Sequence, residues 1–124
     1  MKVVYKDSKV EEICTDLKKA TKFFNGQKNM AISLLSRINA LNQAENIKDI
    51  IAQKVMRFHK LINKGKRKNL EGYFAIDVKT IKDRWRIIIE PLDEDENPFV
   101  PCNIDEIAVY VKIIEIKEVS DYHE

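Results

Sequence analysis

The stretch YFAIDVKTIKDRWRIIIE, residues 73–90, decides the predicted fold. It contains two runs rich in β-branched and aromatic residues, Tyr73–Val78 and Arg84–Glu90, joined by a short polar segment. Such residues favour extended chain, and a short link allows the two strands to pair as a hairpin. A turn is predicted at Pro91, and a third and longest strand at Ile107–Ile116. The second half of the chain is therefore expected to be a β-sheet.

The first half of the chain shows the period of amphipathic helices. Lys2–Lys6 is a predicted short strand, after which Ser8 and Glu11 fit a capping box that begins a helix. This helix has about four turns and ends at Asn25-Gly26, where glycine suits a left-handed cap. Its apolar stripe consists of Val10, Ile13, Cys14, Leu17, Ala20, Phe23 and Phe24. The spacing therefore predicts one helix with one buried face.

A second helix is predicted from about Gln27 to Gln43, and its tight link to the first predicts a helical hairpin. Asn46–Arg57 reads as a short helix that leads into an extended run. The expected order is β-α-α-β-β-β. We expect a single α+β domain over residues 1–124, with a two-helix hairpin packed on a curved, mostly antiparallel sheet.

Composition excludes several classes of protein. Apolar residues make up 44% of the 124 residues and charged residues 34%, which suits one domain with a real core. No apolar run approaches the ~20 residues of a membrane span, and no secretion signal is evident. Cys14 and Cys102 form neither a disulfide framework nor a zinc motif, so we expect two reduced thiols and a cytoplasmic location. Glycine-rich phosphate loops, metalloprotease motifs and serine-hydrolase motifs are missing as well.

Charge is strongly segregated although the net charge is only +2. The stretch from Ile50 to Leu70 contains no Asp or Glu and seven basic residues: Lys54, Arg57, Lys60, Lys64, Lys66, Arg67 and Lys68. The stretch from Ile87 to Val111 contains no Lys or Arg and seven acidic residues: Glu90, Asp93, Glu94, Asp95, Glu96, Asp105 and Glu106. We expect the acidic loop Pro91–Asp105 within it to project away from any RNA site. Exposed cations of this kind neutralise phosphates. The alternative is an ordinary solvated charge run.

Three further features carry possible chemistry. The C-terminal Asp121-Tyr122-His123 offers a carboxylate, a phenol and an imidazole; the alternative is an inert tail. Arg84 and Arg86 alternate with Trp85 along a predicted strand, so both guanidinium groups are expected on the exposed face when Trp85 points to the core. The alternative is the polar outer face of a sheet. His59 precedes the basic loop, and its alternative is a hydrogen-bonded structural residue.

Four fragments occur in a telling order: Phe58-His59-Lys60-Leu61 before a Lys-rich loop, Leu70–Ile76, Arg84–Ile88 and the terminal Asp121-Tyr122-His123. Together they resemble the HigB toxins, also called plasmid maintenance killer proteins, within the RelE/ParE superfamily. That family shows roughly Leu-His-x-Leu-Lys-Gly, Gly-Tyr-Trp-Ser-Ile, Trp-Arg-Ile and Asp-Tyr-His. The resemblance covers about residues 56–123. Phe74 stands where Trp is usual, and both the basic and the acidic loops are longer.

The resemblance implies a metal-independent mRNA endonuclease, the toxin of a type II toxin–antitoxin system. It implies action on ribosome-bound message and inhibition of translation, with no cofactor. The implied partners are a HigA-like antitoxin with a helix-turn-helix DNA-binding part, mRNA on the ribosome, and operator DNA only through the antitoxin, with no membrane. The alternatives are a ParE-like DNA gyrase poison and a non-catalytic basic module that binds RNA or the ribosome.

Site residues follow from the resemblance position by position. The implied catalytic residues are Arg67, Arg86, Asp121, Tyr122 and His123. The resemblance implies RNA contacts at His59, Lys64 and Lys66. The basic stretch adds Arg57 and Lys68 as expected RNA contacts, and the predicted strand adds Arg84. The family lysine of the loop has no unique match, because alignment from His59 selects Lys64, alignment back from Gly72 selects Arg67, and Lys66 is the third candidate.

The expected mechanism uses the ribose 2′-hydroxyl as nucleophile, giving a 2′,3′-cyclic phosphate and a 5′-hydroxyl end. Arg86 and Arg67 (or Lys64) would stabilise charge on the phosphate, since a guanidinium binds its oxygens in a fork. His123 would be the acid, and Asp121 would orient it or act as the base, with the two roles open to exchange. Tyr122 would stack on a base or hydrogen-bond phosphate.

Overall fold

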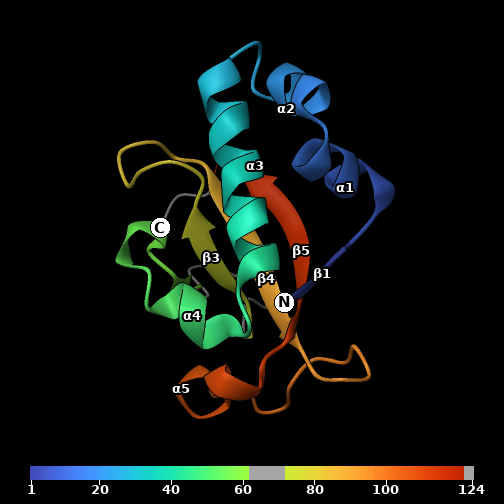
Figure 1. Ribbon diagram of the computed structural model, residues 1–124, viewed down its shortest axis with the longest axis vertical. Helices are drawn as coiled ribbons and strands as arrows, with labels where there is room; N and C mark the ends of the chain where they lie inside the picture. Colours follow the sequence, from blue (N-terminus) through green and yellow to red (C-terminus); the bar gives the residue numbers. More distant parts are fainter. Residues whose placement is uncertain (62–71, 122–124) are drawn as a thin grey trace, which may run out of the picture.

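The computed structural model describes residues 1–61 and 72–121 (Figure 1). The helices within these ranges are α1 (Ser8–Thr15), α2 (Leu17–Phe23), α3 (Lys28–Gln43), α4 (Ile47–Ile51) and α5 (Ile104–Ile107), with 3-10 turns η1 (Lys54–Met56) and η2 (Ala108–Tyr110). The strands are β1 (Lys2–Tyr5), β2 (His59–Lys60), β3 (Phe74–Asp77), β4 (Arg86–Leu92) and β5 (Ile113–Ser120). No helix among the described residues has the length and apolar content that a membrane crossing requires.

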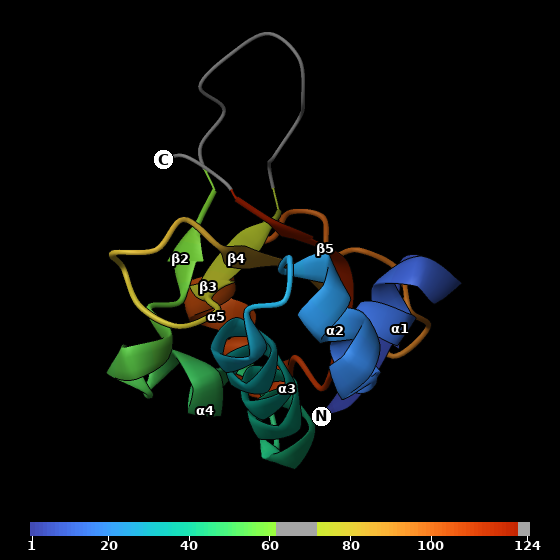
Figure 2. The same cartoon turned by 90° about the horizontal axis from the view of Figure 1, so that it is seen from above.

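The described strands form one sheet in the order β1-β5-β4-β3-β2. The pairs β2–β3, β3–β4 and β4–β5 are antiparallel, whereas β1 lies parallel to β5 at the edge. Helices α1 to α4 all lie on one face of this sheet (Figure 2). The fold is therefore α+β with a mostly antiparallel sheet, as predicted, and the parallel edge pair makes it mixed.

The predicted helical hairpin forms, but its first arm is two helices rather than one. Asp16 has extended backbone angles, and its Oδ1 accepts a hydrogen bond from Lys19 N at 3.1 Å, so it caps α2 and ends α1. The capping-box prediction is also wrong, because Asp7, not Ser8, caps α1 by accepting from Val10 N. Asp16 thus divides the predicted single helix into two, because its side chain caps the start of α2.

The turn between α2 and α3 was predicted correctly. Asn25 and Gly26 both have positive φ angles, and Gly26 N donates to Thr21 O at 2.8 Å across the end of α2. The short helix predicted after Asn46 is α4, which η1 follows before the chain enters β2.

Two predictions in the second half are wrong. Pro91 does not make a turn but lies inside β4, opposite Ile114 of β5. Pro91 lies beyond the last β3–β4 pair, Phe74 with Ile89, so β5 is the only described strand beside it. Proline has no N–H to donate, and at this position it interrupts no hydrogen bonds with β3. The last strand begins at Ile113, not Ile107, because residues 104–110 form α5 and η2.

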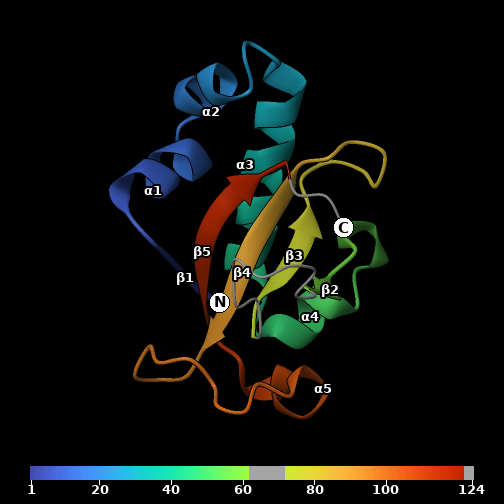
Figure 3. The same ribbon diagram turned by 180° about the vertical axis from the view of Figure 1, so that it is seen from behind.

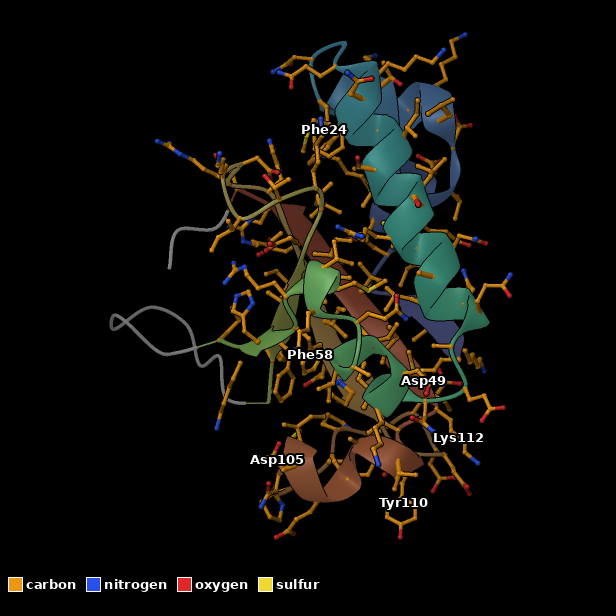
Figure 4. All side chains as sticks on the ribbon, turned by 60° about the vertical axis from the view of Figure 1, so that its left-hand side comes forward. Phe24, Asp49, Phe58, Asp105, Tyr110 and Lys112 are labelled. Carbon is orange, nitrogen blue, oxygen red and sulfur yellow. The ribbon has the colours of Figure 1, made fainter. Side chains whose placement is uncertain are left out.

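The main core lies between the sheet and the helices. It includes Leu34 and Leu41 of α3, Ile76 of β3, Ile87 of β4 and Ile114 of β5, all fully buried. At its upper end Trp85 meets Phe23 and Phe24 edge-on, with ring centroids 5.3 and 5.0 Å away. Near β2, Phe58 stacks on Phe74 at 5.0 Å (Figure 4).

The opposite face of the sheet, which we call the rear face, is seen in front in Figure 3. Leu61, Ala75 and Ile88 form a small buried apolar cluster there, with Tyr73 packed against it. Side chains alternate between faces along a strand, so the neighbours of these residues two positions away also belong to the rear face. This alternation fixes which charged groups share one surface.

Candidate functional site

The strand registers arrange the rear-face residues in rows across the sheet. One row runs from His59 through Ala75 and Ile88 to Glu118. The next row pairs Asp77 with Arg86 and Arg86 with Ser120. Charged groups from three separate segments of the sequence therefore meet at one end of β4.

Asp77 is the centre of the first charged group on this face. Its carboxylate accepts from Arg57 Nε at 3.0 and 3.1 Å and from Arg86 Nε at 3.1 Å. We call Arg57, Asp77 and Arg86 the Arg–Asp–Arg cluster. The side chains of Asp77 and Arg86 are only 2% and 6% exposed, whereas that of Arg57 is 28% exposed. Two cations thus share one buried anion, and one of them reaches the surface.

Arg86 does not lie exposed, so that prediction is wrong. Its guanidinium turns into the loop that joins β3 to β4 and donates to the carbonyls of Asp83 at 2.9 Å and Trp85 at 2.8 Å. Nη2 donates to Ile81 O at 3.3 Å. Alternation placed Arg86 on the correct face, but a buried carboxylate and loop carbonyls draw it under the surface. Arg86 therefore holds the loop between β3 and β4 in place.

Arg57 is the arginine of this cluster whose side chain is partly exposed to solvent. It follows η1 in a left-handed conformation, with φ of 50°. Its carbonyl accepts from His59 Nδ1 at 2.6 Å, so the two residues brace each other before β2. Because a carbonyl only accepts, Nδ1 of His59 carries a proton. This contact agrees with the structural alternative for His59.

Asp121 directly follows Ser120, the register partner of Arg86, and is exposed. It therefore lies next to the row that contains Asp77 and Arg86. Tyr122 and His123 lie outside the described residues, as do Lys64, Lys66, Arg67 and Lys68 of the basic loop. Arg84 is described and exposed, and it precedes β4. Of the predicted site, the described sheet thus brings together Arg57, His59, Arg86 and Asp121.

A second charged group on the rear face was missed from the sequence. Lys117 Nζ lies 3.1 Å from Glu90 Oε1 and 2.5 Å from Glu115 Oε1, and 5.7 Å from the centre of the Tyr73 ring. We call Glu90, Lys117 and Glu115 the Glu–Lys–Glu cluster. The β4–β5 register shifts between Ile88 and Ile89, and Lys117 is the extra residue of β5 at this bulge. A bulge has no clear sequence signal, so the grouping was not predictable.

The electrostatics of this second cluster have a definite direction. Partial burial alone would lower the pKa of Lys117, but hydrogen bonds and charge attraction from Glu115 and Glu90 outweigh it and raise that pKa. Lys117 is therefore a firmly held cation. Nearby, burial raises the pKa of the Cys102 thiol, the charge of Glu90 raises it further, and Lys60 lowers it.

Within residues 1–61 and 72–121, no group of three or more His, Cys, Asp or Glu side chains is placed to bind a metal ion. No protein-family model, no curated protein and no solved structure matches this chain. The function must therefore be argued from the residues themselves.

Proposed function

We propose that this chain is an mRNA endonuclease, the toxin of a type II toxin–antitoxin pair, with a fold like that of the RelE and HigB toxins. One observation carries the proposal. Arg57, Arg86 and Asp121 were singled out in three distant segments of the sequence, and the Arg57–Asp77 ion pair and the sheet register bring these segments to one end of the rear face. A site for a single phosphate needs such convergence of distant segments.

The structure suggests a division of roles that differs from the one the sequence suggested. Among the residues that the structure describes, we assign Arg57 to bind the phosphate, because it is partly exposed and is held by Asp77. Arg86, bound to Asp77 and to loop carbonyls, is a positioning residue that holds Asp77 and thereby Arg57. Asp121 retains its role as base or as orienting group for His123, and Tyr122 and a cation of the basic loop complete the proposed site.

In this site the 2′-hydroxyl loses its proton to the base and attacks the adjacent phosphate. The 5′-oxygen leaves with a proton from the acid, which gives a 2′,3′-cyclic phosphate and a 5′-hydroxyl. The acidic loop begins at the end of β4 opposite Arg86 (Figure 3). Its last residue, Asp105, lies at the lower end of the molecule (Figure 4), so this carboxylate does not face the phosphate site.

The test is inducible expression in bacteria, with mapping of mRNA 5′ ends. Wild type, His123→Ala and Asp121→Asn are compared with Lys48→Gln, which removes one exposed charge from α4 on the helical side. We expect new in-frame cuts with wild type and Lys48→Gln, and at least tenfold fewer with the two site variants. Growth arrest without cuts would contradict the proposal and point to a gyrase poison or a binding module.

A further inference from the structure

The acidic loop builds a pocket that the proposed reaction does not use. The pocket has a volume of about 230 Å³ and is lined by Gly72, Glu90, Pro91, Pro98, Phe99, Val100, Pro101 and Cys102. The loop is folded back to form it. Asp93 N donates to Asn97 O at 2.8 Å, while Asp93 Oδ1 accepts from the backbone of Asp95 and Asn97. Pro98 then bridges to Leu92 of β4.

Two kinds of surface face this pocket. Phe99 and three prolines provide apolar lining, and Glu90 provides a carboxylate. Glu90 Oε1 lies 3.1 Å from Lys117 Nζ, and a carboxylate presents hydrogen-bond acceptors only. Cys102 lines the same pocket, and the charge of Glu90 adds to burial in raising the pKa of its thiol.

We propose that this pocket binds one nucleobase that carries an amino group, namely adenine, cytosine or guanine, from the RNA substrate. The inference rests on the proposed function and deepens it by naming a specificity site. Single-stranded RNA is read by stacking splayed bases on aromatic rings and by hydrogen bonds to their edges. Carboxylates accept from exocyclic amino groups. Uracil has no amino group and would present carbonyl oxygens to Glu90.

Size and position agree with this assignment. The pocket is smaller than the about 300–1,000 Å³ typical of sites for drug-sized ligands, so it suits one ring system. Glu90 lies four residues from Arg86 along β4, a distance of about 13 Å at 3.3 Å per residue. The bound base therefore belongs to a nucleotide beside the cleavage step.

A basic protein side chain is a weaker occupant. Lys117 already neutralises much of the charge on Glu90, so a second cation would gain little there. A neutral amino group needs only a hydrogen-bond acceptor, and the Glu90 carboxylate has acceptor sites beyond the one that Lys117 approaches. The flat wall of Phe99 also suits a planar ring better than a flexible chain.

The experiment titrates the full chain with AMP, CMP, GMP and UMP and follows backbone amide shifts by NMR. The key variant is Glu90→Gln, and Glu115→Gln is its matched control. Both substitutions remove one carboxylate from Lys117, but only Glu90 lines the pocket. Phe99→Leu tests the stacking wall while keeping an apolar side chain.

With wild type we expect AMP, CMP or GMP to shift Gly72, Phe99 and Cys102, and to bind about tenfold more tightly than UMP. Glu90→Gln should remove most of that preference and Phe99→Leu should weaken all binding, with Glu115→Gln like wild type. No shifts at these residues with up to 10 mM nucleotide, or equal loss in the two glutamine variants, would overturn the inference. Such a result beside intact mRNA cutting would leave the proposed function standing, whereas base-selective shifts without cutting would refute the function alone. Shifts produced instead by a short lysine-rich peptide, with none from nucleotides, would assign the pocket to a protein partner.

Discussion

The two charged clusters of the rear face have opposite compositions. At one end of β4, two arginines hold one aspartate, and at the other, two glutamates hold one lysine. The three residues of the Arg–Asp–Arg cluster carry two positive charges and one negative charge, and Asp83 Oδ1 lies 3.8 Å from Arg86 Nη1 beside them. The Glu–Lys–Glu cluster carries two negative charges and one positive charge. In the function we propose, a bound RNA chain would meet its phosphate site at the first end and a site for base edges at the second.

The clusters also differ in burial, and this difference shows which of them is structural. Asp77 is 2% exposed in its side chain, whereas Glu115 and Lys117 are 21% and 22% exposed. Breaking a buried ion pair leaves an uncompensated charge, whereas exposed pairs contribute little. We infer that the first cluster fixes the fold around the β3–β4 loop and that the second can change partners at small cost.

The largest expected effect is that of Asp77→Asn. The substitution leaves Arg57 and Arg86 with no anion between them, so the free energy of unfolding should fall by about 3–5 kcal/mol. Urea unfolding followed by circular dichroism measures this. Asp95→Asn, the same change at an exposed position, should stay within about 0.5 kcal/mol of wild type. A loss below about 1 kcal/mol at Asp77 would show that the cluster is not structural.

The second prediction separates the two arginines. Arg57→Gln should reduce mRNA cutting by about 10²–10³, as expected when one preorganised cation is lost. Its stability should fall less than that of Asp77→Asn, because Arg86 still holds Asp77. Arg86→Gln should instead unfold more readily in urea, since it also frees the carbonyls of Asp83 and Trp85. If Arg57→Gln cuts at the wild-type rate while folded, Arg57 is not the phosphate cation.

The contrast between the clusters shows what the sequence could and could not predict. Periodicity was sufficient for the helical hairpin, the β3–β4 pair and the face on which Arg86 lies. It failed where one polar side chain outweighed the pattern, as when Asp16 capped a new helix and divided the predicted first arm. It also failed for residues 104–110, because the β-prone Ile107–Val111 is helical up to Tyr110 in its tertiary context.

Burial of charge was the least predictable feature. Alternation gives the face of a strand residue but not whether its head group reaches water, and Arg86 is covered because Asp77 and loop carbonyls satisfy it. Likewise, the Glu–Lys–Glu cluster depends on a bulge that brings Lys117 beside Glu115. Arg57 was predicted as an RNA contact, but its hydrogen bond to Asp77, 20 residues away, depends on the tertiary fold and could not be predicted from the sequence.

The third prediction uses pH to separate the clusters. The pKa of Lys117 is raised above its usual 10.5, so its ion pairs contribute stability below that pH and lose it as the pH rises through the raised value. Arginine keeps its charge over the same range. The Lys117 side-chain ¹³Cε signal should therefore titrate above pH 10.5, and in Glu115→Gln it should titrate lower. A Lys117 pKa at or below the usual value would contradict the paired geometry.

The smallest effect is expected for Glu115→Gln measured by urea unfolding. Glu90 still holds Lys117 at 3.1 Å in this variant, and the pair is partly solvated, so the free energy of unfolding should change by no more than about 1 kcal/mol. Raising the salt concentration should reduce even this difference, because screening weakens exposed pairs first. A loss as large as that of Asp77→Asn would show that the two clusters are equally structural. The opposed charges of the rear face would then reflect folding alone and would give no support to a surface that reads RNA.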